Sequence, residues 1–144
     1  HSRVALSNIF TLKLLGAKIK VCGPKSLIPK FIDSLGVKYE QNIEAGLSWC
    51  DAVNILRVQN ERMNETYFPS LREYHHLYGI RLSLIENLRK EILILHPGPI
   101  NRGIEITSEV LDNKKTIVLD QVENGVAIRM AVLYLLASKR EGII

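Results

Sequence analysis

The hydrophobic pattern of the chain changes its period several times. Short runs rich in valine, isoleucine and leucine alternate with longer stretches in which apolar residues recur every three or four positions. The short runs are apolar on both sides, which is typical of buried parallel strands, and the longer stretches have the spacing of amphipathic helices. The pattern predicts strands at residues 17–23, 37–40, 52–58, 91–96 and 116–119.

Helices are predicted between these strands. They cover residues 4–15, a segment from about 26–29 to Gly36, and residues 43–49, 82–88 and 125–140. A long loop that starts at Arg57 leads into a further short helix at about 69–78. Strands that alternate with helices indicate βαβ units. We therefore expect a three-layer, Rossmann-like α/β domain with a mostly parallel sheet of about four or five strands.

The beginning of the chain does not fit a complete sheet of this kind. The sequence opens directly into a helix, whereas a doubly wound sheet normally has a central strand before its first helix. A parallel sheet without that strand would expose unpaired backbone groups. We expect either that another segment fills the gap or that the sheet is shortened at an edge. Because the first residue is His1, the start is interpreted as an excised or processed end, or the chain as a fragment.

Composition narrows the class of protein. The 144 residues, 47% hydrophobic and 24% charged, fit one globular domain or half of a two-domain enzyme. The net charge of +4 is spread without a basic run, so nucleic acid is not an expected partner. The sequence shows neither a membrane span nor a secretory signal. Cys22 and Cys50 form no CxxC pair and are expected to be buried thiols in a reducing, cytoplasmic compartment.

Ligands of open parallel sheets bind beyond the carboxyl ends of the strands, and three segments of this chain fall there. The first is HSRVALSN, which places Arg3 on the first turn of a helix, beside backbone N–H groups that favour anions. Arg3 is either a clamp for a carboxylate or phosphate or an ordinary exposed arginine; its position alone leaves both open.

The second segment is LRVQNER, at the end of a predicted strand. Arg57 and Gln59 are two residues apart, so both side chains point to the same face. Arginine presents a fork of donors to a carboxylate, and glutamine adds a donor and an acceptor. The alternative is a structural ion pair between Arg57 and Glu61 or another carboxylate. Arg62 is interpreted as a residue of the loop rather than as a direct ligand.

The third segment is HPGPINRG, after the predicted strand 91–96. Two prolines around Gly98 fix the backbone, and a cis bond before Pro99 is predicted. Such a loop either aims carbonyl oxygens at an amide or ammonium group or is simply a rigid turn. No metal-binding or nucleophile motif is visible in the sequence. That pattern favours a reaction that depends on positioning and electrostatics.

Together, five segments resemble the aspartate carbamoyltransferase family. They are HSRVALSN, LRVQNER, FPSLREY, HPGPINRG and QVENGVAIRMAVLYLL, and the likeness runs through nearly the whole chain. Ornithine enzymes of the same kind differ at two places, with an SMG-type loop and an HCLP-type segment. The resemblance implies that L-aspartate and carbamoyl phosphate give N-carbamoyl-L-aspartate and phosphate, in pyrimidine biosynthesis, without cofactor or metal.

The same resemblance implies a role for each site residue. Arg3 and Arg57 would hold the two carboxylates of aspartate, and Gln59 would orient that substrate. Backbone atoms of Gly98 and Pro99 would contact the carbamoyl group. Arg62 would belong to a loop that closes over the site. No residue of this chain is expected to act as a catalytic acid, base or nucleophile.

The resemblance also implies partners. The family's N-terminal half, which binds carbamoyl phosphate, has no counterpart here, so residues 1–144 are interpreted as one aspartate-binding domain that is inactive alone. A homotrimer is expected in the complete enzyme, with dihydroorotase or regulatory chains as further possible partners. The apolar face of residues 125–136 is expected to be partly uncovered. The alternative is a non-catalytic fragment that serves as a binding or assembly module.

Overall fold

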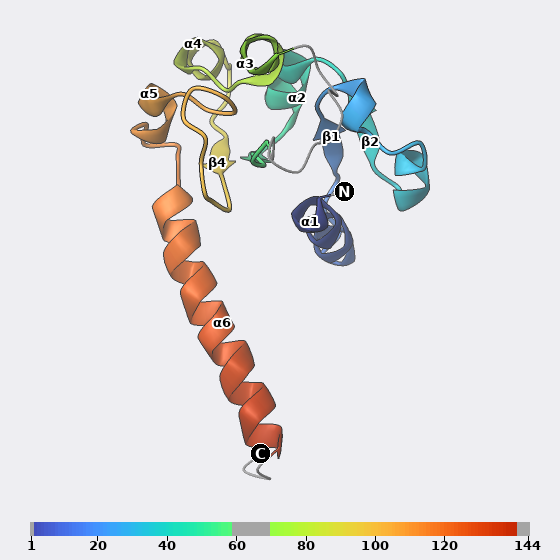
Figure 1. Cartoon of the computed structure of the whole chain (residues 1–144), viewed down its shortest axis with the longest axis vertical. Helices are drawn as coiled ribbons and strands as arrows, with labels where there is room; N and C mark the ends of the chain where they lie inside the picture. The colour runs from blue at the N-terminus through green and yellow to red at the C-terminus, as the bar shows by residue number, and fades with distance from the viewer. Residues whose placement is uncertain (1, 59–69, 141–144) are drawn as a thin grey trace.

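The computed structural model describes residues 2–58 and 70–140, without the side chains of residues 139 and 140. Its elements are short, apart from the first and last helices (Figure 1). They are α1 (Arg3–Leu14), β1 (Lys20–Cys22), η1 (Lys25–Leu27), η2 (Ile32–Leu35), β2 (Lys38–Glu40), α2 (Ile43–Trp49), β3 (Ala52–Asn54), α3 (Leu71–Tyr78), α4 (Leu82–Glu86), β4 (Leu93–Leu95), α5 (Ser108–Leu111) and α6 (Val118–Arg140). The predicted α/β class is confirmed.

The strands form two parallel pairs. β1 pairs with β2, and β3 pairs with β4, with Ala52 opposite Leu93. Within the described residues, no further strand joins the two pairs into one sheet. The sequence analysis left open whether another segment takes the place of the missing central strand. No described segment does so. Helix α2 links the pairs, because Leu47 packs in the core beside β3 and β4 while Gly46 lies against Cys22 of β1.

The prediction of a fifth strand at residues 116–119 is wrong. Only Thr116 makes a bridge, to Ile94, and the chain enters α6 at Val118. Helix α6 thus begins seven residues before the predicted start at Gly125. Asp120 in the first turn faces the positive end of the helix dipole, which favours this early start. Residues 116–119 have the composition of a strand, but Val118 and Leu119 already belong to α6.

The prediction of a helix from about residues 26–29 to Gly36 is also wrong. The segment forms two 3-10 turns, η1 and η2, and Pro29 lies between them. Proline has no N–H and clashes with the preceding turn, so a continuous α-helix is disfavoured there. The expected stop at Gly36 is confirmed, with φ at +70°. Helix α5 was not predicted.

Other helix boundaries agree closely with the sequence. Helix α1 starts after Ser2, whose side chain accepts a hydrogen bond from the backbone N–H of Ala5 at 3.2 Å. It ends before Gly16, whose φ is +78°. Helix α2 has the predicted bounds and is capped by Asn42, which accepts from the N–H of Ala45 at 3.0 Å. These side chains satisfy N–H groups that a helix end leaves unpaired.

Burial is concentrated on one side of the molecule. A large core surrounds β3 and β4, and a small one lies under α1 and β1. The large core consists of Leu47, Ile55, Ile80, Leu84, Ile85, Ile92, Ile94, Ile106 and Val110. The small core has only Ile9, Ile32 and Val37.

The strands are less buried than the sequence predicted. Among the strand residues that the structure describes, only Ile94 is buried, and Leu93 is half exposed. Helix α6 projects away from the strands as a long rod, so it does not cover them (Figure 1). Its own apolar residues lie exposed, as expected for residues 125–136. No helix in the described ranges combines the length and apolarity that a bilayer crossing requires.

Candidate functional site

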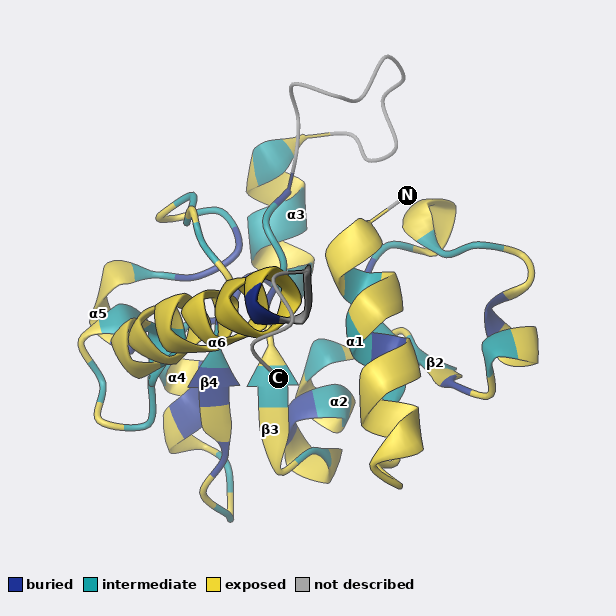
Figure 2. Cartoon of the chain, turned by 90° about the horizontal axis from the view of Figure 1, so that it is seen from below, coloured by how far each residue is buried: buried dark blue, intermediate teal, exposed yellow. Residues whose placement is uncertain are grey.

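The carboxyl ends of β3 and β4 bring two of the predicted segments together. Arg57 lies three residues beyond β3, and His96 directly follows β4. Because the two strands are parallel neighbours, both segments leave the same edge of the pair. In Figure 2 the N-terminal end of α1, where Arg3 lies, faces the same side of the molecule.

The Arg57 side chain is half-buried and has a defined neighbour. Its Nε donates a hydrogen bond to Oδ1 of Asn101 at 3.4 Å. The side-chain amide of Asn101 in turn donates to the carbonyl of Val58 at 3.1 Å. The segment after β3 is therefore tied to the loop after β4. Sequence reasoning missed Asn101, because 44 residues separate it from Arg57.

The loop after β4 is fixed by its own hydrogen bonds. The backbone N–H of His96 donates to Oε1 of Gln121 in α6 at 2.9 Å. The N–H of Gly98 donates to Nδ1 of His96, also at 2.9 Å. Gly98 has φ at +66°, a left-handed conformation that glycine adopts without strain. The predicted cis bond between Gly98 and Pro99 is confirmed. Gly98 is half-buried and Pro99 is exposed.

Beneath this loop lies a buried pair of polar side chains. His96 is 0% exposed and Glu105 is 1% exposed. Nε2 of His96 is 3.4 Å from Oε1 of Glu105 without forming a hydrogen bond. The same Oε1 accepts a hydrogen bond from the N–H of Asn101 at 2.6 Å. The hydrogen bond from Asn101 therefore ties the loop after β4 to a buried carboxylate. Glu105 was not predicted from the sequence.

Arg3 stands apart from this cluster. It is the first residue of α1, and its side chain is exposed. Gln59, Glu61 and Arg62 lie outside the described residues, so the structure says nothing about them. The structure thus brings Arg57, Gly98 and Pro99 to one edge and puts Arg3 on a separate helix.

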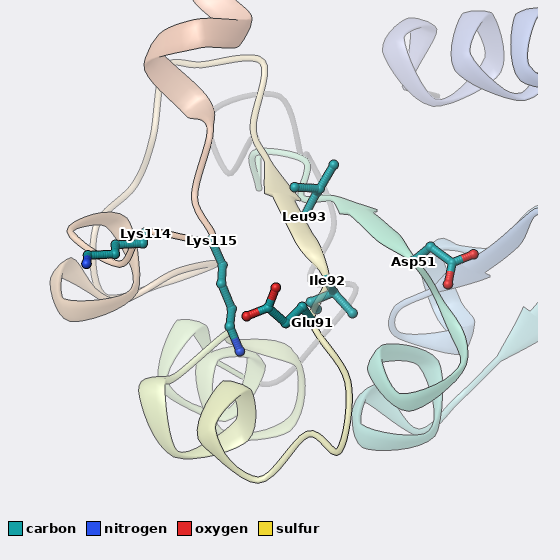
Figure 3. A pocket seen from close by; sticks show the side chains of 6 residues that line it. All are labelled: Asp51, Glu91, Ile92, Leu93, Lys114 and Lys115. Atoms are coloured by element: carbon teal, nitrogen blue, oxygen red, sulfur yellow. The ribbon is translucent and has the colours of Figure 1, made fainter.

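A different part of the surface holds a pocket of about 280 Å³ (Figure 3). It lies at the amino ends of β3 and β4, opposite the predicted site. Its lining mixes charged and apolar residues: Asp51, Glu91, Ile92, Leu93, Lys114 and Lys115. Asp51 also pairs with Lys90 at 3.1 Å. None of the candidate site residues named from the sequence lines this pocket.

Burial raises the pKa of several thiol and phenol groups in the described ranges. Burial, together with the nearby Glu40 carboxylate, raises the pKa of the Cys22 thiol to about 11. Burial also raises the pKa of Tyr74 to about 12, with a contribution from Glu105. Both groups therefore stay protonated at neutral pH, and thiolate is the reactive form of cysteine. In the described ranges, no three His, Cys, Asp or Glu side chains gather in a way that would hold a metal.

Comparison with known proteins identifies one family. A family model described as the Asp/Orn binding domain of aspartate/ornithine carbamoyltransferase matches residues 1–136. The aspartate carbamoyltransferase catalytic subunit of Christiangramia forsetii is 66% identical over 139 residues, which cover 96% of this chain and 45% of that protein. The subunit of Flavobacterium psychrophilum is 63% identical with the same coverage. The chain spans a little under half the length of these curated relatives.

Solved structures agree with this result at the level of the fold. The catalytic subunit of M. jannaschii aspartate transcarbamoylase superposes with a TM-score of 0.71 at 26% identity, over 92% of this chain and 45% of that one. An anabolic ornithine carbamoyltransferase from Campylobacter jejuni gives a TM-score of 0.71 at 18% identity, over 90% of this chain and 46% of that one. The second likeness concerns the fold alone.

Proposed function

The chain belongs to the aspartate/ornithine carbamoyltransferase family, and on that premise we propose that it supplies the aspartate-binding half of an aspartate carbamoyltransferase. The complete enzyme would transfer a carbamoyl group from carbamoyl phosphate to L-aspartate, an early step of pyrimidine biosynthesis. Relatives more than 60% identical to the chain carry the name of the aspartate enzyme. That identity favours aspartate over ornithine as the acceptor.

One observation carries the proposal: a half-buried arginine lies at the same edge as a fixed Gly98–Pro99 turn. Arg57 offers a planar donor fork, which matches a carboxylate with two parallel hydrogen bonds. Partial burial strengthens such a bond, because fewer water molecules compete for the charge. In the proposed reaction, Arg57 and Arg3 each hold one carboxylate of L-aspartate, and Gln59 orients that substrate.

The proposed chemistry requires positioning more than it requires reactive side chains. The amine of aspartate forms a C–N bond with the carbamoyl carbon, the C–O bond to phosphate breaks, and the amine loses a proton. Backbone atoms of Gly98 and Pro99 contact the carbamoyl group beside the amine. Arg62 belongs to a loop that closes over the bound substrates. Holding two reactants in attack geometry can supply roughly 7–11 kcal/mol of the barrier.

The proposal includes partners that supply what this chain lacks. A domain that binds carbamoyl phosphate provides the phosphate site, and the complete cytoplasmic enzyme is a homotrimer, with dihydroorotase or regulatory chains as possible additions. No cofactor is required. The exposed apolar residues along α6 support a large interface, since contiguous apolar surface of this kind marks interaction sites.

Complementation tests the proposal. Carbamoyl-aspartate formation is measured with this chain alone, and with the N-terminal part of the Christiangramia forsetii subunit supplied as a second polypeptide. We expect turnover only in the mixture, and none when the chain carries Arg57→Ala. A folded chain that gives no turnover in any mixture would favour the alternative, a non-catalytic binding or assembly module.

A further inference from the structure

We propose that Asn101 is a positioning residue that orients the Arg57 guanidinium toward the substrate carboxylate, with buried Glu105 as its anchor. This inference rests on the proposed function, because it concerns the same aspartate site. It adds two residues that the sequence analysis did not single out. Both lie on the segment after β4, whereas Arg57 lies on the segment after β3.

The side-chain amide of Asn101 can face only one way. The carbonyl of Val58 is an acceptor, so the NH2 group of Asn101 must point toward it, at 3.1 Å. Nε of Arg57 is a donor, so the amide oxygen of Asn101 must face it, at 3.4 Å. The two contacts require the same orientation. Asn101 thus binds the Arg57 guanidinium and the backbone carbonyl of the following residue, Val58, which limits rotation of the arginine side chain.

The backbone of Asn101 is in turn hydrogen-bonded to Glu105. The N–H of Asn101 donates to Oε1 of Glu105 at 2.6 Å, and Glu105 is 1% exposed. A short hydrogen bond to a carboxylate oxygen is stronger than one between neutral groups. Since Glu105 lies in the protein interior, beside the core residue Ile106, the anchor moves little relative to the core.

The same carboxylate oxygen lies close to the side chain that holds the turn expected to contact the carbamoyl group. Nδ1 of His96 accepts from the N–H of Gly98, and Nε2 of the same ring is 3.4 Å from Oε1 of Glu105 without a hydrogen bond. Glu105 therefore lies next to both sides of the site, but its hydrogen bond is to the Arg57 side, at the backbone of Asn101.

The test uses a full-length chimera in which this chain replaces the matching segment of the Christiangramia forsetii subunit. We expect Asn101→Ala to raise KM for L-aspartate about tenfold, which is the scale of one hydrogen bond to a charged group. KM for carbamoyl phosphate should change less than about twofold, because the backbone bond to Glu105 survives. Asn113→Ala, which removes a similar local hydrogen bond outside the site, serves as the matched control and should behave like the wild type.

A second variant separates orientation from simple packing. Asn101→Asp keeps the shape of the side chain but places a carboxylate beside Arg57, where it competes with the substrate. We expect its KM for L-aspartate to rise more than that of Asn101→Ala. If Asn101 served packing alone, the nearly isosteric aspartate would be the milder change, and that order would overturn the inference. Equal rises in both KM values for Asn101→Ala would overturn it as well.

The same experiment distinguishes failure of the proposed function from failure of the role assigned to Asn101. An active wild-type chimera with an unchanged Asn101→Ala variant overturns this inference and leaves the proposed function intact. If the wild-type chimera is inactive, the proposed function fails, and calorimetric binding of succinate, a dicarboxylate without the amine, decides about Asn101. Weaker succinate binding by Asn101→Ala than by wild type would support the role of Asn101. Equal binding, or no binding by either protein, would overturn it.

Discussion

The side of the molecule built on β3 and β4 has a closed core, whereas the side built on β1, β2 and α1 does not. Within the described part of the chain, nine buried apolar residues form the core at β3 and β4, but only three lie between α1, η2 and the start of β2. Helix α1 has a single buried residue, Ile9, and leaves Phe10 and Leu14 exposed. Figure 2 shows this contrast as blue and teal around β4 and mostly yellow along α1 and α6.

The contrast divides the proposed site in two. Arg57, Gly98 and the Asn101–Glu105 anchor rest on the large core, so their geometry is set within this chain. Arg3 rests on α1, which has little holding it in place. The part of the proposed site at Arg57 and Gly98 is therefore preformed. The position of Arg3 depends on what covers the apolar surface of α1. The predictions below test that division.

The largest effect is expected from the two arginines. Arg57→Ala should lower kcat/KM for L-aspartate about 10²- to 10³-fold in the full-length chimera, since losing a shielded charge partner costs about 3–4 kcal/mol. Arg3→Ala should cost about tenfold less, because the exposed arginine on the loosely held helix is less shielded from water. Steady-state kinetics of both variants measure this difference. Equal losses would show that α1 is as firmly placed as the strands.

The next effect concerns the two cores. Ile94→Ala should lower the free energy of unfolding by about 4 kcal/mol, near the upper part of the range for such truncations, because Ile94 is fully buried. Ile9→Ala should cost about 2 kcal/mol, because the small core collapses more easily around the change. Urea unfolding followed by circular dichroism gives both values. A loss at Ile9 as large as that at Ile94 would contradict the comparison.

A third effect concerns the rod formed by α6. Leu133 and Leu136 are both more than half exposed, so this chain alone should associate with itself at micromolar concentration. Replacing both with lysine should shift the sedimentation coefficient toward that of a monomer. Glu123→Lys, also exposed on α6, is the control for the change of charge and should leave association as it is. Unchanged association in the double variant would show that another surface is responsible.

The smallest effect is expected at Gly125. This residue lies inside α6, and an added methyl group would meet no atom within 4 Å. Alanine in place of glycine in a helix interior stabilises by about 0.5–1 kcal/mol. Gly125→Ala should therefore raise the thermal midpoint slightly. A lower midpoint would mean that the helix does not continue through Gly125 as described.

Sequence signals at the ends of helices predicted the structure reliably. Helix α2 was predicted with its observed bounds, Ile43–Trp49. Gly36 was predicted as the end of a segment, and Gly16 directly follows the predicted helix 4–15; both adopt the left-handed backbone conformation. The segment 116–119 was mistaken for a strand because its composition is that of a strand, whereas its structure depends on where α6 begins. Period and propensity alone do not decide such short apolar runs.

The site was predictable only in part, for a physical reason. Arg57 and the Gly98–Pro99 turn follow strands, so the carboxyl-end rule placed them on one edge. Asn101 carries no spacing signal, because its side-chain partners Arg57 and Val58 lie on the segment after β3 and meet it only in the folded chain. Glu105 meets Asn101 and His96 within an irregular segment, where no periodic pattern marks it. The extent of burial could not be predicted either. Apolar strands indicated full coverage, but the coverage depends on surfaces that α1 and α6 do not provide.

The most direct test of the central claim is the choice of acceptor. The full-length chimera is given carbamoyl phosphate with equal concentrations of L-aspartate and L-ornithine, and the two carbamoylated products are separated and counted. The account predicts N-carbamoyl-L-aspartate as the product in large excess, and its loss in Arg57→Ala. Formation of N-carbamoyl-L-ornithine, or a product ratio that Arg57→Ala leaves unchanged, would contradict the assignment of this chain as the aspartate-binding half.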